Sequence, residues 1–185
     1  MRALLNFILP AHYDGDLKQC LARGASLARS YSHDYIGVEH VFLSLRDLPP
    51  EHPVATILAK LPVDVVSFWR DLEKEARVLT GRRVPDTLPF TPRLQFILRS
   101  ASRVAKDRGT REVSLFHFVA AVALEHTSLV AQVLYRHLQI RGAPRDFSEA
   151  SARMLALLIA FPGVITFNAQ GTPNQNIADS FRAAP

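Results

Sequence analysis

The sequence repeats itself at a spacing of 77 positions, and this repeat limits the folds open to the chain. Residues 17–45 match residues 94–122, and the stretch 54–58 matches 130–134 after a one-residue gap. The best-matched pairs are Leu17/Leu94, Leu21/Leu98, Gly24/Ala101, Ala28/Ala105, Ile36/Val113, Val38/Leu115, His40/His117 and Leu45/Val122. Such a repeat is one supersecondary unit built twice, and the two copies bury each other's apolar faces.

Apolar residues recur three and four positions apart over most of the chain, which predicts amphipathic helices. Capping residues and prolines set the expected boundaries. The eight expected helices cover about 16–31, 38–45, 54–60, 62–78, 92–108, 115–122, 129–137 and 144–161. The prediction is an all-α fold of two pseudo-symmetric four-helix repeats with short non-helical N- and C-terminal extensions.

The same pattern divides the chain into segments. An apolar N-terminal arm, 1–14, precedes repeat one at 15–78, and a linker at 79–90 leads to repeat two at 91–161. The tail at 162–185 is rich in Asn, Gln, Gly and Pro, and we expect it to be partly disordered. On the fourth helix we expect five side chains to face inward: Val63, Val66, Trp69, Leu72 and Ala76.

Composition narrows the possible classes of protein. Hydrophobic residues make up 48% of the 185, which is enough for a core, but no apolar run approaches the roughly 20 residues that cross a bilayer. The apolar stretch at the N-terminus is interrupted by Asn6, so a secretory signal is not expected. Cys20 is the only cysteine, which excludes an internal disulfide and fits a cytoplasmic location.

Two motifs resemble those of one known family. Residues 28–45, ARSYSHDYIGVEHVFLSL, are similar to the His-x-Tyr-Ile-Gly turn and Glu-His-Leu-Leu-Leu-x-Leu helix of the Clp ATPase N-terminal domain. Residues 90–93, Phe-Thr-Pro-Arg, resemble the opening of that domain's second repeat. The likeness covers about residues 15–160, and the match is weaker in repeat two.

The resemblance implies a binding role. In that family the domain stands at the front of a hexameric unfoldase, where it receives substrates or adaptor proteins. This sequence contains no G-x-x-x-x-G-K-[ST] motif, and none of its eight glycines is followed by lysine, so no phosphate-binding loop is expected. We therefore expect a stand-alone, non-enzymatic recognition module, an accessory or adaptor-type factor for a Clp-type ATPase or its substrates.

The resemblance also implies which residues bind the partner. In phosphoarginine-binding members, a glutamate of this motif in each repeat contacts the ligand. The matching positions here are Glu39 and Phe116, so at most one such site is kept. The alternative is that Glu39 only stabilises the start of a helix, where negative charge is favoured. The expected partner-binding set is Glu39, His33, Tyr35, Phe116 and Arg93.

Other reactive side chains favour structural roles. His40 and His117 lie in register among apolar neighbours, and no set of three or four convergent ligands accompanies them. We expect hydrogen-bonded, partly buried histidines, with no metal and no cofactor. Cys20 falls on the apolar stripe of the first helix and is expected to be a buried hydrophobe. No catalytic residue is expected.

A second function remains open at this point. The net charge is +5, and the helix 93–111 is rich in arginine. Its face with Arg99, Arg103 and Lys106 could bind an anion or nucleic acid. We see no aromatic residue interleaved on that face, which disfavours single-stranded nucleic acid. The first expectation is therefore a protein partner (a Clp-type ATPase, a substrate or an apolar helix), no membrane, and a monomer.

Overall fold

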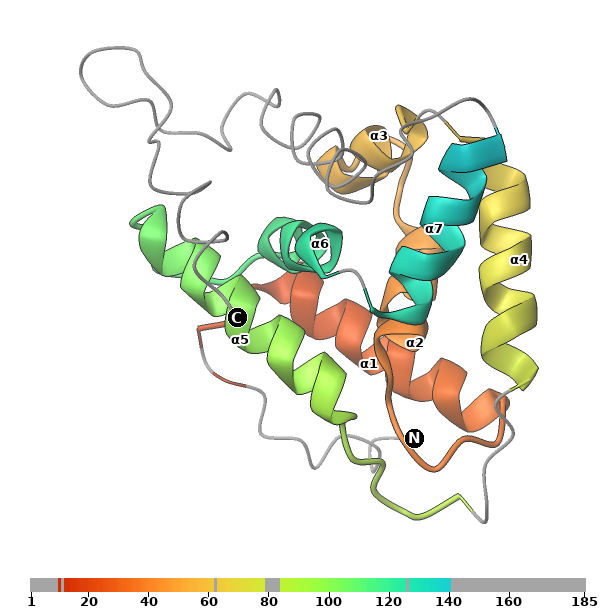
Figure 1. Cartoon of the computed structure of the whole chain (residues 1–185). Coiled ribbons are helices and arrows are strands. Elements are labelled where there is room, and N and C mark those ends of the chain that lie inside the picture. Colours follow the sequence, from red (N-terminus) through yellow and green to blue (C-terminus); the bar gives the residue numbers. More distant parts are fainter. Residues whose placement is uncertain (1–9, 11, 62, 79–83, 126, 141–185) are drawn as a thin grey trace.

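The computed structural model describes residues 10, 12–61, 63–78, 84–125 and 127–140, and these residues form an all-α fold (Figure 1). Within them, short helices alternate with tight turns. The helices are α1 (Gly15–Ser30), α2 (Val38–Leu43), η1 (Ser44–Asp47), α3 (Pro53–Ala59), α4 (Val65–Val78), α5 (Pro92–Asp107), α6 (Leu115–Leu124) and α7 (Leu129–Ile140). The predicted all-α class is confirmed.

Local sequence signals explain where these helices start and stop. The Asp14 carboxylate accepts a hydrogen bond from the Leu17 N–H at 2.7 Å and caps α1. The Thr91 hydroxyl accepts from the Leu94 N–H at 3.1 Å, and Pro92 occupies the first turn of α5. After α5 the chain turns at Gly109, whose φ of 68° lies in the left-handed region that glycine adopts without strain.

Two matching pairs of backbone hydrogen bonds link the two repeats. Ile36, just before α2, donates its N–H to the Pro89 carbonyl and accepts from the Thr91 N–H, at 2.8 and 3.0 Å. Val113, just before α6, does the same with His12 and Asp14, at 2.8 and 3.0 Å. Each repeat is therefore hydrogen-bonded to the segment that leads into the first helix of the other repeat. The equivalent helices are α1 and α5, α2 and α6, and α3 and α7.

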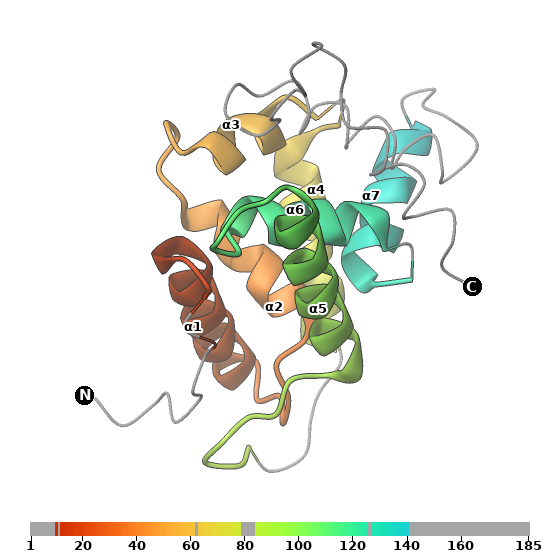
Figure 2. The same ribbon diagram turned by 90° about the vertical axis from the view of Figure 1, so that its left-hand side faces the viewer.

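The core runs through both repeats. Phe42 of α2, Phe68 of α4 and Phe118 of α6 are among its largest fully buried side chains. Helix α1 packs on α2 and α6, and α7 packs on α2, α4 and α6. In both views α3 lies at one end of the molecule, and the segments that enter α2 and α5 lie at the opposite end (Figures 1 and 2).

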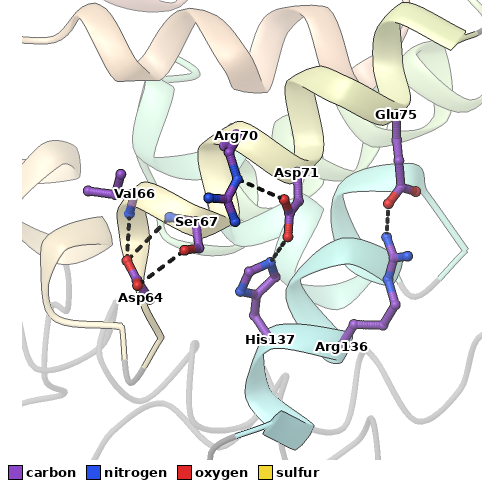
Figure 3. Close-up of polar contacts among 8 residues, drawn as sticks. All are labelled: Asp64, Val66, Ser67, Arg70, Asp71, Glu75, Arg136 and His137. Carbon is purple, nitrogen blue, oxygen red and sulfur yellow. Dashed lines mark hydrogen bonds and ion pairs between the residues drawn. The ribbon is translucent and has the colours of Figure 1, made fainter.

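Helix α4 corrects one prediction. It begins at Val65 and not at 62, because the Asp64 carboxylate accepts from the backbone N–H groups of Val66 and Ser67 (Figure 3). Phe68, Leu72 and Ala76 are buried, whereas Val66 is 77% exposed. The inward stripe follows the spacing 65, 68, 72 and 76, which places Val66 about 100° away from its centre.

Polar contacts join α4 to α7 across the two repeats. His137 lies 3.0 Å from Asp71 through its Nε2 atom, and Arg136 pairs with Glu75 (Figure 3). Asp71 also accepts from Arg70 at 3.2 Å. These contacts lie beside the buried ring of Phe68, which meets the His137 ring edge-on at 5.9 Å between centroids. Apolar packing and polar pairing therefore act on the same helix pair.

Several sequence expectations fall outside the described residues. These are the helix at 144–161, the tail at 162–185, and most of the N-terminal arm and of the first half of the linker. Among the helices that are described, none is individually long and apolar enough to cross a membrane. Helices α6 and α7 meet that test only when taken together, and they bend by 70° between them.

Candidate binding pocket between the repeats

The turn before α2 is built around two buried histidines. The Gly37 N–H donates to Nδ1 of His40 at 2.9 Å, so the other nitrogen of the neutral ring carries the proton. That nitrogen, Nε2, lies 2.7 Å from Nδ1 of His33 and donates to it. In repeat two the Ser114 N–H donates to Nδ1 of His117, also at 2.9 Å. Both motif histidines therefore accept a hydrogen bond at the start of a helix, and the expectation of hydrogen-bonded histidines is confirmed.

Burial keeps these histidines neutral at physiological pH. Desolvation, followed by the nearby charge of His33, lowers the pKa of His40 to about 3. Desolvation, followed by the charge of Arg108, lowers the pKa of His117 to about 4. Neither ring can then act as a cation beside a carboxylate.

Glu39 is the residue most affected by this geometry. It lies in the first turn of α2 with only 7% of its surface exposed, and burial raises the pKa of its carboxyl above the ordinary value of 4.5. Its Oε1 lies 3.4 Å from His40 Nδ1, but that nitrogen is neutral and already accepts the Gly37 N–H. The Glu39 carboxylate therefore has no cationic partner among the described residues.

Gly37 allows the carboxylate to take this position. A Cβ atom on Gly37 would lie 2.0 Å from Oε1 of Glu39 and 2.5 Å from its Cδ. The backbone φ of Gly37 is −100°, so glycine is needed here for space and not for its conformational freedom.

Glu39 opens into a pocket of about 410 Å³ between the two repeats. Repeat one contributes the turn into α2, and repeat two contributes the starts of α5 and α7. The lining residues are Tyr35, Val38, Glu39, Thr91, Pro92, Arg93, Thr127, Ser128 and Leu129. The backbone contacts of Ile36 with Pro89 and Thr91 bring these distant segments together.

Three residues of the pocket lining, Arg93, Thr127 and Ser128, form a hydrogen-bond network with Glu125. Arg93 donates to Oε1 of Glu125 at 2.5 Å, and the Thr127 hydroxyl donates to the same oxygen. The N–H groups of Thr127 and Ser128 donate to the carboxylate at 3.0 and 2.7 Å. Burial alone would raise the pKa of Glu125, but these hydrogen bonds and the charge of Arg93 lower it. Glu125 thus has a cationic partner, whereas Glu39 has none among the described residues.

The structure places the five predicted partner-binding residues in three environments. Glu39, Tyr35 and Arg93 line the pocket. His33 is fully buried and stacks on Tyr35, with ring centroids 5.4 Å apart, so it supports the wall from behind. Phe116 lies at the equivalent place in repeat two and does not line this pocket. Its ring faces Arg108, whose guanidinium carbon is 5.5 Å from the ring centroid.

The equivalent position in repeat two differs in chemistry. Where the first pocket has Tyr35, Thr91 and Arg93, repeat two has Glu112, Asp14 and Asp16. The pseudo-symmetry of the backbone therefore does not extend to the side chains at these equivalent positions.

Sequence reasoning missed Glu125, Thr127, Ser128 and Leu129. The Ser128 hydroxyl accepts from the Ala131 N–H at 3.2 Å and caps α7. A Thr-Ser pair before an apolar helix is a capping signal that could have been read. Nothing in the sequence near Glu125 indicates that it faces Arg93, which lies 32 positions away.

The described part of the chain gives little support to metal binding or to a cysteine nucleophile. No group of three or more His, Cys, Asp or Glu side chains there could hold a metal ion. Cys20 is buried, and burial raises the pKa of its thiol, which opposes thiolate formation. The pocket offers a carboxylate without a cationic partner among the described residues, an arginine paired with Glu125, hydroxyl groups and apolar edges. These groups are suited to binding a ligand.

Comparison with known proteins agrees with the observed fold. Among solved structures, the N-terminal domain of Candida albicans Hsp104 superposes with a TM-score of 0.64 at 13% identity, over 82% of this chain and 92% of that one. The N-terminal domain of the ClpV1 ATPase from the E. coli EAEC Sci1 type VI secretion system gives 0.60 at 21% identity, over 80% and 86%.

A third structure contains a bound peptide. It is a complex of a ClpV N-domain with a VipB peptide, and it matches with a TM-score of 0.57 at 18% identity, over 80% of this chain and 88% of that one. At these identities the likeness establishes the fold. The family described as the Clp repeat (R) N-terminal domain matches residues 12–137. The chain therefore belongs to the Clp repeat N-terminal domain family.

Proposed function

We propose that this chain is a non-enzymatic protein-recognition module that takes a cationic side chain of its partner into the pocket between the repeats. The observation that carries the proposal is the buried carboxylate of Glu39, which has no cationic partner among the described residues. An ionised carboxylate is costly to bury unless a cation or several hydrogen bonds compensate it. A guanidinium supplies both, because its planar fork matches a carboxylate.

The rest of the pocket supports a peptide and not a free ion. Val38, Pro92 and Leu129 provide apolar edges for the stem of a long side chain, and Tyr35 provides an aromatic one. Arg93 and the hydroxyl groups also line the pocket, where they suit a polar or anionic group on the same ligand. Arginine and phosphoarginine both fit this description.

In its biological setting we place this module beside a Clp-type ATPase, as an accessory or adaptor-type factor that presents substrates. The support is family membership together with a pocket built for a side chain. The peptide-bound ClpV N-domain shows that the fold can hold a peptide.

Binding of short labelled peptides tests the pocket. The probe is a fluorescein-labelled Gly-Ser peptide with one central arginine, and a second probe carries phosphoarginine. Fluorescence anisotropy should detect binding that Glu39→Gln weakens about tenfold or more, because a charge-assisted hydrogen bond contributes about 1.5–3 kcal/mol. Glu112→Gln, an exposed glutamate in the equivalent turn of repeat two, is the matched control.

A glycine pair tests the same geometry without changing any charge. Gly37→Ala should weaken binding because its Cβ displaces the Glu39 carboxylate, whereas Gly15→Ala meets no atom within 4 Å and should bind normally. Circular dichroism must first show that all variants remain helical. Equal binding by Glu39→Gln and the unmutated chain would exclude this pocket as the recognition site.

A further inference from the structure

The outward face of α5 is a second candidate surface. Phe96, Arg99, Arg103 and Lys106 follow one another at intervals of three and four positions, so they share one side of the helix. The opposite side holds the buried residues Leu94, Ile97, Leu98, Ala101, Val104 and Ala105. Phe96 is 53% exposed, which makes it one of the few large apolar side chains on the surface. An aromatic residue therefore does lie on the basic face, contrary to the sequence analysis.

Several other arginines of the chain are paired with carboxylates of the fold. Arg46 and Arg77 bind Glu73, Arg70 binds Asp71, and Arg136 binds Glu75. By contrast, Arg99, Arg103 and Lys106 are exposed and form no ion pair within the described residues. Phe96 at one end of this row and three cations without an ion pair among the described residues form a surface complementary to an acidic segment that carries an apolar residue.

This face continues directly from the pocket. Pro92 and Arg93 line the pocket and form the first turn of α5. At 1.5 Å per residue, Phe96 lies about 6 Å along the helix axis from Pro92, and Lys106 lies about 21 Å from it. An extended peptide advances about 3.3 Å per residue, so some six residues beyond the pocket would cover the whole face.

We infer that the segment whose cationic side chain enters the pocket continues over α5 as an acidic stretch with one apolar residue against Phe96. This inference rests on the proposed function of the pocket and adds a motif to it: one basic residue, then acidic residues within about six positions on one side. The opposite charges of Glu39 and of the α5 face set the direction in which the segment binds.

The charge pattern favours a short protein segment over nucleic acid. Glu39 and Glu125 lie at the pocket end of the basic face, and Asp107 follows Lys106 at the other end. A long polyanion would meet carboxylates at both ends, whereas a short acidic segment lies between them. Three cations also neutralise few phosphates, while nucleic-acid binding commonly uses about six to ten phosphate contacts.

The experiment compares three labelled peptides on the full chain. The first is the single-arginine Gly-Ser peptide, and the other two add the stretch Asp-Glu-Leu-Asp-Glu after or before the arginine. One of the two extended peptides should bind about tenfold more tightly than the short one at moderate salt. The double variant Arg99→Glu/Arg103→Glu should lose this gain, and Phe96→Ala should lose part of it.

A charge-matched control distinguishes the effect of the α5 face on binding from the effect of the protein's net charge. Arg23→Glu/Lys74→Glu makes the same change in net charge on α1 and α4, and it should keep the gain. All these positions lie on helix surfaces, and thermal unfolding checks that each variant folds. A fifteen-nucleotide oligo-dT is the polyanion probe, and it should bind more weakly than the extended peptide.

The outcomes separate the two proposals. If no arginine peptide depends on Glu39, the pocket proposal fails. If the short peptide depends on Glu39 but neither extension improves binding, the pocket stands and the α5 inference is overturned. A gain that survives Arg99→Glu/Arg103→Glu also overturns it, as does tighter binding of oligo-dT that these substitutions abolish, because the face would then serve nucleic acid.

Discussion

Glu39 is the residue for which the sequence left two roles open, helix capping and partner binding. It lies in the first turn of α2, where a carboxylate is favoured by the backbone N–H groups. It is also 93% buried, at the edge of a pocket, in contact with a histidine that is neutral at pH 7. A purely capping glutamate would gain by being exposed. The burial of this one is the feature that capping does not explain.

The first prediction concerns the pH dependence contributed by Glu39. Burial raises the folded-state pKa of this carboxyl above 4.5, so the folded protein holds its proton more tightly than the unfolded chain does. Its contribution to stability is therefore full below pH 4.5 and is lost as pH rises through the folded pKa. Glu39→Gln should remove this loss, and be at least as stable as the unmutated chain at pH 7.

Urea unfolding followed by circular dichroism at pH 4, 5.5 and 7 measures this effect. The difference in unfolding free energy between Glu39→Gln and the unmutated chain should grow in favour of the variant as pH rises. The prediction is wrong if Glu39→Gln is clearly less stable at pH 7 than at pH 4, relative to the parent.

At the scale of elements, the contact between the first and second helices differs between the two repeats. Gly24 of α1 faces Val41 of α2, and a Cβ added there would lie 3.0 Å from the Cα, N and Cγ2 atoms of Val41. The equivalent residue in α5 is Ala101, which is fully buried. The packing of α5 on α6 therefore accommodates a methyl group that the packing of α1 on α2 does not.

The second prediction is that Gly24→Ala destabilises the protein although alanine is the better helix former. The propensity gain is about 1 kcal/mol, while overpacking against backbone atoms costs about 1–3 kcal/mol. Gly15→Ala, with open space around it, gives the propensity effect without a clash. Chemical denaturation compares the two, and a Gly24→Ala protein as stable as Gly15→Ala would contradict the close approach of α1 and α2.

Across the whole molecule, the two repeats form one core and not two independent lobes. The Ile36 and Val113 contacts connect each repeat to the entry of the other, and α7 packs on both α2 and α4. Asp71 and His137 add a polar contact between α4 and α7. Neither repeat buries its apolar faces alone, so we expect them to unfold together.

The third prediction uses Trp69, the single tryptophan, which lies on α4 of repeat one. Phe118→Ala in repeat two removes a fully buried ring and should cost about 3–5 kcal/mol. Because the core is shared, Trp69 fluorescence and far-UV circular dichroism should shift to the same lower midpoint. A tryptophan transition left in place while the helical signal shifts would show that the repeats unfold separately.

The elements and their ends follow from local sequence, because helical periodicity and capping depend on neighbours within a few positions. This explains why the all-α class, the starts at Val38, Pro92 and Leu115, and the hydrogen-bonded state of the two motif histidines were predicted. The exposure of Val66 was not, since residues three positions apart drift about 60° around a helix, and Val66 lies off the stripe of Phe68, Leu72 and Ala76.

The sequence alone determined the fold class and the repeat, because both can be read from the spacing of apolar residues along the chain. Which residues line the pocket could be determined only from the tertiary structure. Tyr35, Arg93 and Ser128 come from three segments joined by backbone contacts that no local pattern encodes. The same holds for the difference between Glu39 and Glu125: whether a buried carboxylate is paired depends on which distant side chains the fold brings beside it.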